Sequence, residues 1–324
     1  MANRIRLPTL VVFLFLEKSM EHDKGPSATL RRLLKGPQFL IMPCCYDALT
    51  ARLIQDEGFP LTFMSGFSVS ATRLGLPDTG MISYGEMADQ LRNICSIARI
   101  PVIADGDTGY GNAVNVKRTV QGYIQAGAAG IMIEDQRGPK RCGHTSGKEV
   151  VDRDTAIARV RAAMEARNEA NAAGKDIVIM ARTDARATHG LGEAIERAKI
   201  FSDMGADILF VEAPCSVEEM EAICREAGGC QMANMVEHGK TPVLPPARLE
   251  ELGYKIAAYP LTLLSASLYA MKRALSALKK GDSFDDLMDF KDLQTIVGFS
   301  EYDETLTRLE GNLCHEIGSG QKKD

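Results

Sequence analysis

Two aspartates, Asp105 and Asp107, follow directly on a short apolar run at residues 101–104. An uninterrupted apolar run of this length is typical of a parallel strand that is buried on both faces. Two carboxylates held close together repel each other unless a cation lies between them. Mg²⁺ suits such a pair, because it binds one or two carboxylates together with water. The alternative is an ordinary turn with solvated Asp and Gly residues.

Polar residues also follow the other apolar runs of the chain. The set comprises Asp47, Ser65, Asp105 with Asp107, Glu134 with Asp135, Arg182, Glu212, Asn234 and Tyr259. Solvated loops would not place one such group after each apolar run. We therefore interpret the set as parts of one functional site.

The residue types in this set indicate a site for a small anion. Asp105, Asp107 and Glu134 outnumber the cations, which favours bound Mg²⁺, or Mn²⁺ in its place. Arg182 can bind a carboxylate through two parallel hydrogen bonds. We expect the backbone amides of Ser65-Gly66-Phe67 to bind the same anion. A metal ion here would stabilise charge that develops on a 2-keto or enolate oxygen.

One cysteine has charged neighbours in the sequence. Residues 136–145 read Gln-Arg-Gly-Pro-Lys-Arg-Cys-Gly-His-Thr, so Cys142 lies beside Lys140, Arg141 and His144. Neighbouring cations lower the pKa of a thiol, so we expect a reactive cysteine. The glycines of this segment favour a mobile lid. A flexible basic loop with an incidental cysteine is the alternative.

The elements that must position these residues alternate regularly from residue 38 onward. Strands are predicted at residues 39–43, 61–64, 101–104, 130–133, 177–181, 208–211, 231–233 and 255–258, with helical patterns between them. This alternation predicts an α/β fold, a closed (β/α)₈ barrel of the TIM type over residues 38–280. An open doubly wound sheet would require a glycine-rich turn after the first strand, and Cys44-Cys45-Tyr46-Asp47 stands there instead.

Two segments flank the predicted barrel. Residues 1–37 contain an apolar run at 10–16 that is too short to span a bilayer and lacks a small-residue cleavage site. We interpret this segment as a peripheral helix or a disordered extension, with targeting to an organelle as the alternative. Residues 281–324 are predicted to form a C-terminal helical segment.

The composition argues against several kinds of partner. The formal net charge is −5, and Lys and Arg are scattered, so neither nucleic acid nor a membrane is predicted to bind. The eight cysteines are irregularly spaced without a C-x-x-C pair, which predicts free thiols in a reducing compartment such as the cytoplasm. The five histidines form no close pair that would indicate a His-rich metal site.

Together, the motifs resemble those of the isocitrate lyase/phosphoenolpyruvate mutase superfamily, within it the 2-methylisocitrate lyase-like and carboxyvinyl-carboxyphosphonate phosphorylmutase-like proteins. The motifs are Ser65-Gly-Phe67, Leu76-Pro-Asp78, Asp105-Gly-Asp-Thr-Gly-Tyr-Gly-Asn112, Glu134-Asp-Gln136, Lys140-Arg-Cys-Gly-His144, Ala181-Arg-Thr-Asp-Ala185 and Val211-Glu-Ala213. The resemblance implies a (β/α)₈ barrel that forms a homotetramer with its last helix swapped between subunits.

The resemblance also implies a role for each site residue. Mg²⁺ would be bound directly by Asp105 and through water by Asp78, Asp107 and Glu134. The carboxylate that becomes part of a 2-keto acid would be held by Ser65, Gly66, Phe67 and Arg182. The other half of the substrate would be bound by Gly143, His144, Glu212 and Asn234.

The implied reaction is cleavage of the C2–C3 bond of a 2-hydroxy di- or tricarboxylate, such as a 2-methylisocitrate-like or dimethylmalate-like acid. In family lyases the lid cysteine, here Cys142, protonates the enolate product, and Arg182 and Glu212 complete the catalytic set. Family phosphonomutases, which form a P–C bond, generally lack Cys-Gly-His; this activity is the alternative. Pro260 resembles the lyases of substituted substrates, which disfavours oxaloacetate hydrolysis. A non-catalytic binding protein that keeps the barrel is a third hypothesis.

Overall fold

The computed structural model describes residues 25–318, so the apolar run at residues 10–16 lies outside the described range. Contacts divide the chain into two compact units, one ending at Ser265 and the other beginning at Ala266. No helix of the described residues is long and apolar enough to cross a membrane.

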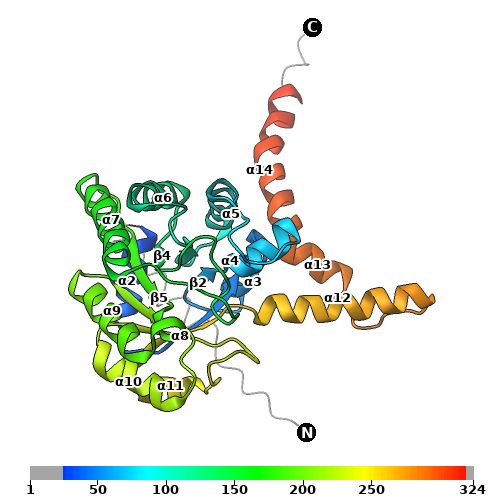
Figure 1. Cartoon of the computed structure of the whole chain (residues 1–324). Helices are drawn as coiled ribbons and strands as arrows, with labels where there is room; N and C mark the ends of the chain where they lie inside the picture. The colour runs from blue at the N-terminus through cyan, green and yellow to red at the C-terminus, as the bar shows by residue number, and fades with distance from the viewer. Residues whose placement is uncertain (1–24, 319–324) are drawn as a thin grey trace. The chain divides into compact units, whose positions relative to one another are not determined.

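Eight parallel strands of the first unit close into a barrel (Figure 1). The strands are β1 (Leu40–Cys45), β2 (Thr62–Met64), β3 (Val102–Asp105), β4 (Gly130–Glu134), β5 (Val178–Thr183), β6 (Ile208–Val211), β7 (Gln231–Asn234) and β8 (Tyr254–Tyr259). Each strand pairs with the next, and β1 pairs with β8 to complete the ring. The predicted (β/α)₈ barrel is therefore confirmed.

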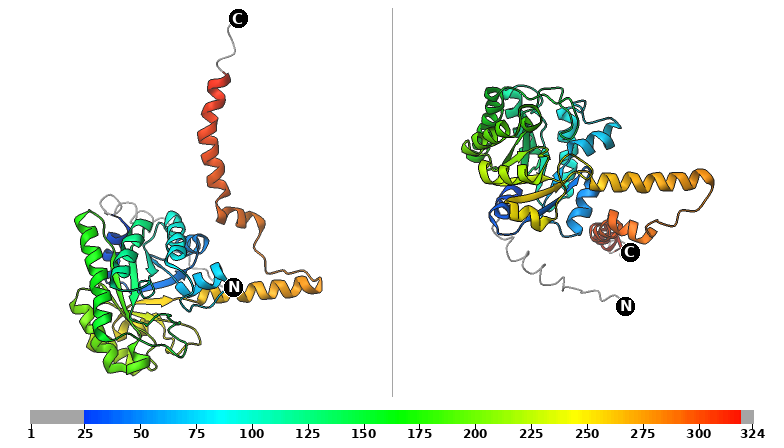
Figure 2. Two further views of the ribbon diagram at one scale, coloured as in Figure 1. Left: turned by 45° about the horizontal axis from the view of Figure 1, so that its top comes forward. Right: turned by 60° about the horizontal axis from the view of Figure 1, so that its bottom comes forward.

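Helices of the first unit cover the outside of this barrel (Figure 2). They are α2 (Pro26–Lys35), α3 (Ala48–Asp56), α4 (Gly66–Val69) with a π-helical turn at Ser70–Leu74, α5 (Tyr84–Ile97), α6 (Ala113–Ala126), α7 (Arg153–Ala172), α8 (Ala185–His189), α9 (Leu191–Asp203), α10 (Val217–Ala227) and α11 (Pro246–Leu252). The next helix, α12 (Thr262–Lys280), begins in this unit and continues into the second one.

The strands are apolar because both of their faces are buried. Every residue of β3, β4, β5 and β6 is buried. Met42, Ile103 and Met180 belong to one cluster that fills the barrel interior, as expected for a closed barrel of this size. The barrel is thus a packed scaffold whose strand ends are free to carry polar groups.

Two strands, β1 and β5, extend two residues further than the sequence predicted. β1 continues to Cys45, which pairs with Met64, and β5 continues to Thr183, which pairs with Val211. The predicted ends at residues 43 and 181 were wrong, because ladder pairing continues through the first polar residues. As a result, Arg182 lies on the strand itself and its backbone is fixed by the sheet.

The residues before the helices follow local capping rules. Asp47 precedes α3, and its Oδ1 accepts a hydrogen bond from the amide of Thr50 at 2.7 Å. Asp47 is therefore a helix cap and not a member of the functional set proposed from the sequence. Asn112 caps α6 in the same way, through the amides of Val114 and Asn115.

The described part of the N-terminal segment, α2, packs against the barrel. Leu30 is completely buried in the cluster that fills the barrel interior. Arg31 contacts Asp176 at 2.6 Å and Asp207 at 2.5 Å, just before β5 and β6 begin. This helix therefore covers the amino-terminal end of the strands, opposite to the end where polar residues gather.

The second unit is helical and displays many apolar side chains. It contains most of α12, then α13 (Phe290–Val297) and α14 (Phe299–Gly318). Exposed apolar residues of this unit include Tyr269, Leu275, Leu278 and Phe290. The division between the units lies within α12, after Ser265, whereas the predicted boundary at residue 280 falls at the end of this helix.

Candidate active site

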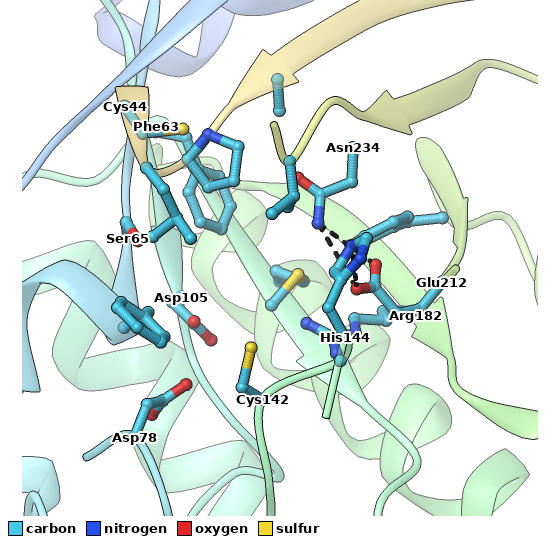
Figure 3. Close-up of a pocket in the computed structure, with 18 of the residues that line it drawn as sticks. Cys44, Phe63, Ser65, Asp78, Asp105, Cys142, His144, Arg182, Glu212 and Asn234 are labelled. Carbon is cyan, nitrogen blue, oxygen red and sulfur yellow. Dashed lines mark hydrogen bonds and ion pairs between the residues drawn. The ribbon is translucent and has the colours of Figure 1, made fainter. Parts of the chain in front are cut away.

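The carboxyl ends of the strands surround one cavity of about 60 Å³ (Figure 3). The predicted site residues that line it are Ser65, Phe67, Asp78, Asp105, Cys142, Gly143, His144, Arg182, Glu212 and Asn234. The other three predicted residues contact this set: Gly66 and Asp107 bond to Asp105, and Glu134 contacts Arg182. The barrel thus brings together residues that lie far apart in the sequence.

Asp105 is the centre of a buried group of carboxylates. Its Oδ1 accepts a hydrogen bond from the amide of Asp107 at 2.9 Å, and its Oδ2 accepts one from the amide of Gly66 at 3.2 Å. A Cβ at position 66 would overlap Asp105 Oδ2, so this approach requires glycine. Burial and the neighbouring Asp107 raise the pKa of Asp105 to about 6.

Lys140 lies between two other carboxylates of this group. Its Nζ is 2.5 Å from Asp78 Oδ1 and 2.6 Å from Asp107 Oδ1. Although burial opposes the charge, Asp107 and Asp78 raise the pKa of Lys140. The lysine is therefore a buried cation that ties its loop to the strand ends.

The group still carries more negative than positive charge. Asp78, Asp105, Asp107 and Glu134 face Lys140, whereas Arg182 is shared between Glu134 and Asp184. Glu134 Oε1 is buried without a hydrogen-bond partner, and burial raises the pKa of this carboxyl. An excess of buried carboxylates with an unpartnered oxygen fits a hard divalent cation.

The spacing of the carboxylates limits how such a cation could be held. Among the described residues, no three Asp, Glu, His or Cys side chains lie close enough together to enclose a metal ion. Water would therefore have to supply much of the ligand shell. Mg²⁺ is the common biological cation that retains several water ligands.

Glu212 anchors the opposite side of the cavity. His144 Nε2 lies 3.2 Å from Glu212 Oε1, and Asn234 Nδ2 donates to Glu212 Oε2 at 3.3 Å. His144 Nδ1 accepts a hydrogen bond from the amide of Lys240, which leaves the proton of a neutral imidazole on Nε2. Although burial alone would raise it, Arg182 and His144 lower the pKa of Glu212, so this carboxylate is charged.

Cys142 projects into the cavity from the loop after β4, here called the lid (residues 137–149). Figure 3 shows its sulfur between Asp105 on one side and Arg182 with His144 on the other. Burial raises the pKa of this thiol, and Glu212 and Asp78 add to the effect. The expected lowered pKa was wrong, because Lys140 is paired with carboxylates and burial outweighs the remaining positive charge.

The backbone amides predicted to bind the anion are largely engaged. The amide of Ser65 donates to Cys45 O at 3.0 Å, and that of Gly66 donates to Asp105. The hydroxyl of Ser65 accepts a hydrogen bond from the amide of Ser68. In this structure the amides of Ser65 and Gly66 thus donate within the chain, whereas the sequence analysis expected all three amides of Ser65-Gly66-Phe67 to bind the anion.

Asp135 and Tyr259 do not line the cavity, contrary to the set inferred from strand ends. Asp135 accepts hydrogen bonds from Thr183 Oγ1 at 2.6 Å and from Arg197 at 2.9 Å, behind the sheet. It follows Glu134 directly, and successive strand residues point to opposite faces. Tyr259 is half-buried and packs in the cluster outside the barrel.

Apolar side chains form the part of the cavity wall that the sequence analysis missed. They include Cys44 of β1, Phe63 of β2 and Ala258 of β8; Pro260, which the sequence analysis did single out, lies just beyond β8. Met132, Phe210 and Met232 complete this apolar wall. The charged wall residues on the strands come from β3 to β6 (the charged arc), where Met132 of β4 and Phe210 of β6 add apolar surface; the wall residues from β8, β1 and β2 (the apolar arc) carry no charge. Apolar strand residues carry no signal that distinguishes a cavity wall from the core.

The family model described as phosphoenolpyruvate phosphomutase matches residues 30–279. The chain belongs to this family. Among curated relatives, 2,3-dimethylmalate lyase of Eubacterium barkeri is 42% identical over 86% of this chain and 93% of its own length. Chloroplastic carboxyvinyl-carboxyphosphonate phosphorylmutase of Arabidopsis thaliana is 40% identical over 89% of this chain and 86% of its own length. 2-Methylisocitrate lyase of Aeropyrum pernix is 38% identical over 86% and 89%.

Solved structures agree with this assignment. 2,3-Dimethylmalate lyase, described as a PEP mutase/isocitrate lyase superfamily member, has a TM-score of 0.83 at 37% identity over 88% of this chain and 95% of its own. Oxaloacetate acetylhydrolase with 3,3-difluorooxalacetate has a TM-score of 0.85 at 33% identity, over 89% and 98%. Phosphonopyruvate hydrolase with oxalate and Mg²⁺ has a TM-score of 0.76 at 27% identity, over 88% and 98%. The protein is an enzyme of the PEP mutase/isocitrate lyase superfamily.

A pair of glycine substitutions tests whether the lid closes as described. A Cβ at Gly143 would overlap Glu212 Oε1, whereas a Cβ at Gly138 meets nothing within 4 Å. We expect Gly143→Ala to open the lid and to accelerate tryptic cleavage after Arg141 by about tenfold, since cleavage follows the open population. Gly138→Ala, in the same lid, serves as the control and should leave the rate unchanged. Equal rates for both variants would contradict the packing of Gly143 against Glu212.

Proposed function

We propose that this enzyme is a Mg²⁺-dependent carbon–carbon lyase that cleaves a 2-hydroxy di- or tricarboxylate, of the 2-methylisocitrate or 2,3-dimethylmalate type. The observation that supports this best is the thiol of Cys142 in the cavity, with a raised pKa that keeps it protonated. A protonated thiol is the form that a general acid requires. Relatives named as lyases of these two substrates support the same conclusion.

The charged residues of the cavity suit the two ends of such a substrate. Arg182 would hold the carboxylate next to the 2-hydroxyl through charge-assisted hydrogen bonds. His144 and Asn234, which contact Glu212, would bind the other end together with the amide of Gly143. A charged carboxylate of the cavity would accept the proton of the 2-hydroxyl, and the C2–C3 bond would then break to leave a carbonyl product and an enolate. The thiol of Cys142 then donates its proton to the enolate carbon.

The carboxylates at the other side would hold the metal. Asp105 would bind Mg²⁺ directly, and Asp78, Asp107 and Glu134 would hold its water ligands; Mn²⁺ could take the same place. The metal would stabilise negative charge on the keto and enolate oxygens. Burial and Asp107 raise the pKa of Asp105, and a bound cation would lower it and favour the charged carboxylate.

The apolar arc of the cavity would bind the substituent on C3. Phe63, Phe67 and Pro260 offer hydrocarbon surface for a methyl or larger alkyl group. Pro260 has no side-chain donor for a polar C3 substituent. We therefore favour an alkyl-substituted acid over oxaloacetate.

A panel of 2-hydroxy di- and tricarboxylates with Mg²⁺, assayed for keto-acid release, tests this proposal. Release from no member of the panel would refute the lyase.

Replacement of Cys142 tests its role as the general acid. We expect Cys142→Ala to lower kcat by at least about 100-fold, because general acid catalysis contributes this much. Binding of Mg²⁺ and of oxalate, measured by calorimetry, should be retained. Cys215→Ala removes an exposed thiol outside the cavity and serves as the control. Undiminished kcat in Cys142→Ala would exclude the assigned role.

Replacement of Asp105 tests the proposed metal site. Asp105→Asn removes the charge that would ligate Mg²⁺, so we expect its affinity to fall by more than about tenfold in a calorimetric titration. Asp47→Asn is the matched control, since Asp47 also follows a strand but caps α3, and Asn caps helices equally well. If the wild type, Asp105→Asn and Asp47→Asn bound Mg²⁺ with similar affinity, the metal would have to bind elsewhere.

A phosphonomutase is the alternative function, favoured by the description of the family model and by the relative named as a phosphorylmutase. Such an enzyme forms a P–C bond and needs no thiol acid. Phosphorus NMR after incubation with phosphoenolpyruvate and Mg²⁺ would show a phosphonate signal if this activity were present. Keto-acid release without that signal favours the lyase.

We further propose that the chain forms a homotetramer through its second unit. Exposed apolar residues on α12, among them Leu275 and Leu278, need a second copy to cover them. Light scattering should give four times the chain mass of 35.2 kDa. Leu275→Glu with Leu278→Glu should lower this mass, and Leu49→Glu on exposed α3 should not. A monomeric wild type would refute the assembly.

We propose the cytoplasm as the compartment. The cysteines at seven positions from Cys44 to Cys230 are free thiols, as a reducing environment allows. An organelle is the alternative, since one relative is named as chloroplastic. Fractionation of cells that express the tagged full chain distinguishes the two.

A further inference from the structure

A second buried lysine of the lid, Lys148, contacts Asp184, the carboxylate that also binds Arg182. Lys148 lies at the end of the lid, with its side chain 2% exposed, and its Nζ is 2.7 Å from Asp184 Oδ1. Asp184 also accepts two hydrogen bonds from Arg182, from Nε at 2.8 Å and from Nη2 at 3.1 Å. One carboxylate therefore binds two cations, and only Arg182 reaches the cavity.

The backbone around Asp184 is held firmly. Its amide donates to Asp135 Oδ1 at 2.9 Å, and Asp135 is itself bonded to Thr183 and Arg197. Although burial opposes it, Arg182 and Lys148 lower the pKa of Asp184, which keeps this carboxylate charged. The side chain of Asp184 is therefore a fixed anchor for both cations.

The lid segment that carries Lys148 is also fixed at its base. Gln136 pairs with Val150 in an antiparallel bridge, and the amide of Arg137 donates to Glu149 O at 2.8 Å. Lys148 thus lies where the lid rejoins the barrel, on the other side of the lid tip from Lys140. In the sequence, Cys142 lies between these two buried lysines.

The positive charge of Lys148 affects how strongly Arg182 can attract an anion in the cavity, because both side chains bind the same carboxylate. Arg182 paired with Asp184 alone would be a nearly neutral unit, and Glu134, 3.3 Å from Arg182, adds a further negative charge. A second cation on Asp184 brings the formal charge of these four groups from −1 to zero, so that less of the charge of Arg182 is neutralised from behind. Interactions of this kind are strong in a buried site because little water screens them.

We propose that Lys148 is a positioning residue that, through Asp184, orients Arg182 and preserves its positive charge for the substrate carboxylate. Lys148 itself does not touch the cavity. The proposal rests on the proposed function in one respect, namely that Arg182 receives a carboxylate. It links the base of the lid to anion binding through a single shared aspartate.

The test uses the full-length protein with Mg²⁺, with oxalate as the probe, and compares Lys148→Met with Lys148→Arg. We expect Lys148→Met to weaken calorimetric oxalate binding and to raise KM by at least about tenfold, with kcat changed less than KM. Lys148→Arg restores the charge and should recover most of the affinity. Lys199→Met removes a surface lysine paired with Glu196 and is the control.

A double-mutant cycle with Asp184→Asn separates positioning from general stability. If Lys148 acts through Asp184, then Lys148→Met should have little further effect on oxalate binding in the Asp184→Asn background. The double variant has no buried charge at position 184 that lacks a partner. It can therefore be compared with Asp184→Asn even if Lys148→Met alone does not fold.

The outcomes distinguish this inference from the proposed function. Wild-type binding of oxalate, with unchanged binding in Lys148→Met, would overturn the role of Lys148 and leave the lyase intact. A loss of the same size in both backgrounds, or a fall in kcat with unchanged KM and oxalate affinity, would also overturn it. Failure of the wild type to bind oxalate would count against carboxylate recognition by Arg182 itself.

Discussion

Buried negative charge at the carboxyl ends of β3 and β4 is the constraint on which the rest of the site depends. Asp105, Asp107 and Glu134 lie close together out of solvent, and Asp78 joins them from the loop after β2. Buried like charges are costly, so they have to be neutralised by cations. Lys140 and Arg182 supply part of the positive charge, and a divalent metal is the chemistry that fits the remainder.

The same constraint explains the structure of the lid. Lys140 closes the lid tip onto Asp78 and Asp107, and Lys148 fixes its base on Asp184. Contact between His144 and Glu212 holds the far side of the tip. Cys142 lies between these attachments and is half-buried, and this loss of solvent raises the pKa of its thiol. The protonation state of the proposed acid thus follows from lid closure and not from neighbouring residues in the sequence.

The architecture could be predicted from sequence because each barrel strand is buried on both faces and so reads as an apolar run. The positions of Asp105, Arg182, Glu212 and Asn234 followed from topology, since parallel strands end on one face. Side-chain direction could not be predicted in this way. Glu134 and Asp135 are adjacent, yet only the first faces the site, and Asp47 and Tyr259 have other roles.

Three further features depended on three-dimensional packing. The amides of Ser65 and Gly66 donate hydrogen bonds to Cys45 and Asp105, and no local sequence pattern predicts these contacts. Lys148 and Asp184 were likewise assigned no role, because their pairing joins segments that are 36 positions apart. Apolar wall residues such as Phe63 were indistinguishable from core residues until the cavity was defined.

The separation of the barrel mouth into a charged arc and an apolar arc has an evolutionary consequence. The charged arc comes from β3 to β6 and carries the residues proposed to bind the metal and the carboxylate. The apolar arc, from β8 through β1 to β2, can change residue by residue without disturbing that electrostatic framework. New substrate preferences could therefore arise through single substitutions in this arc.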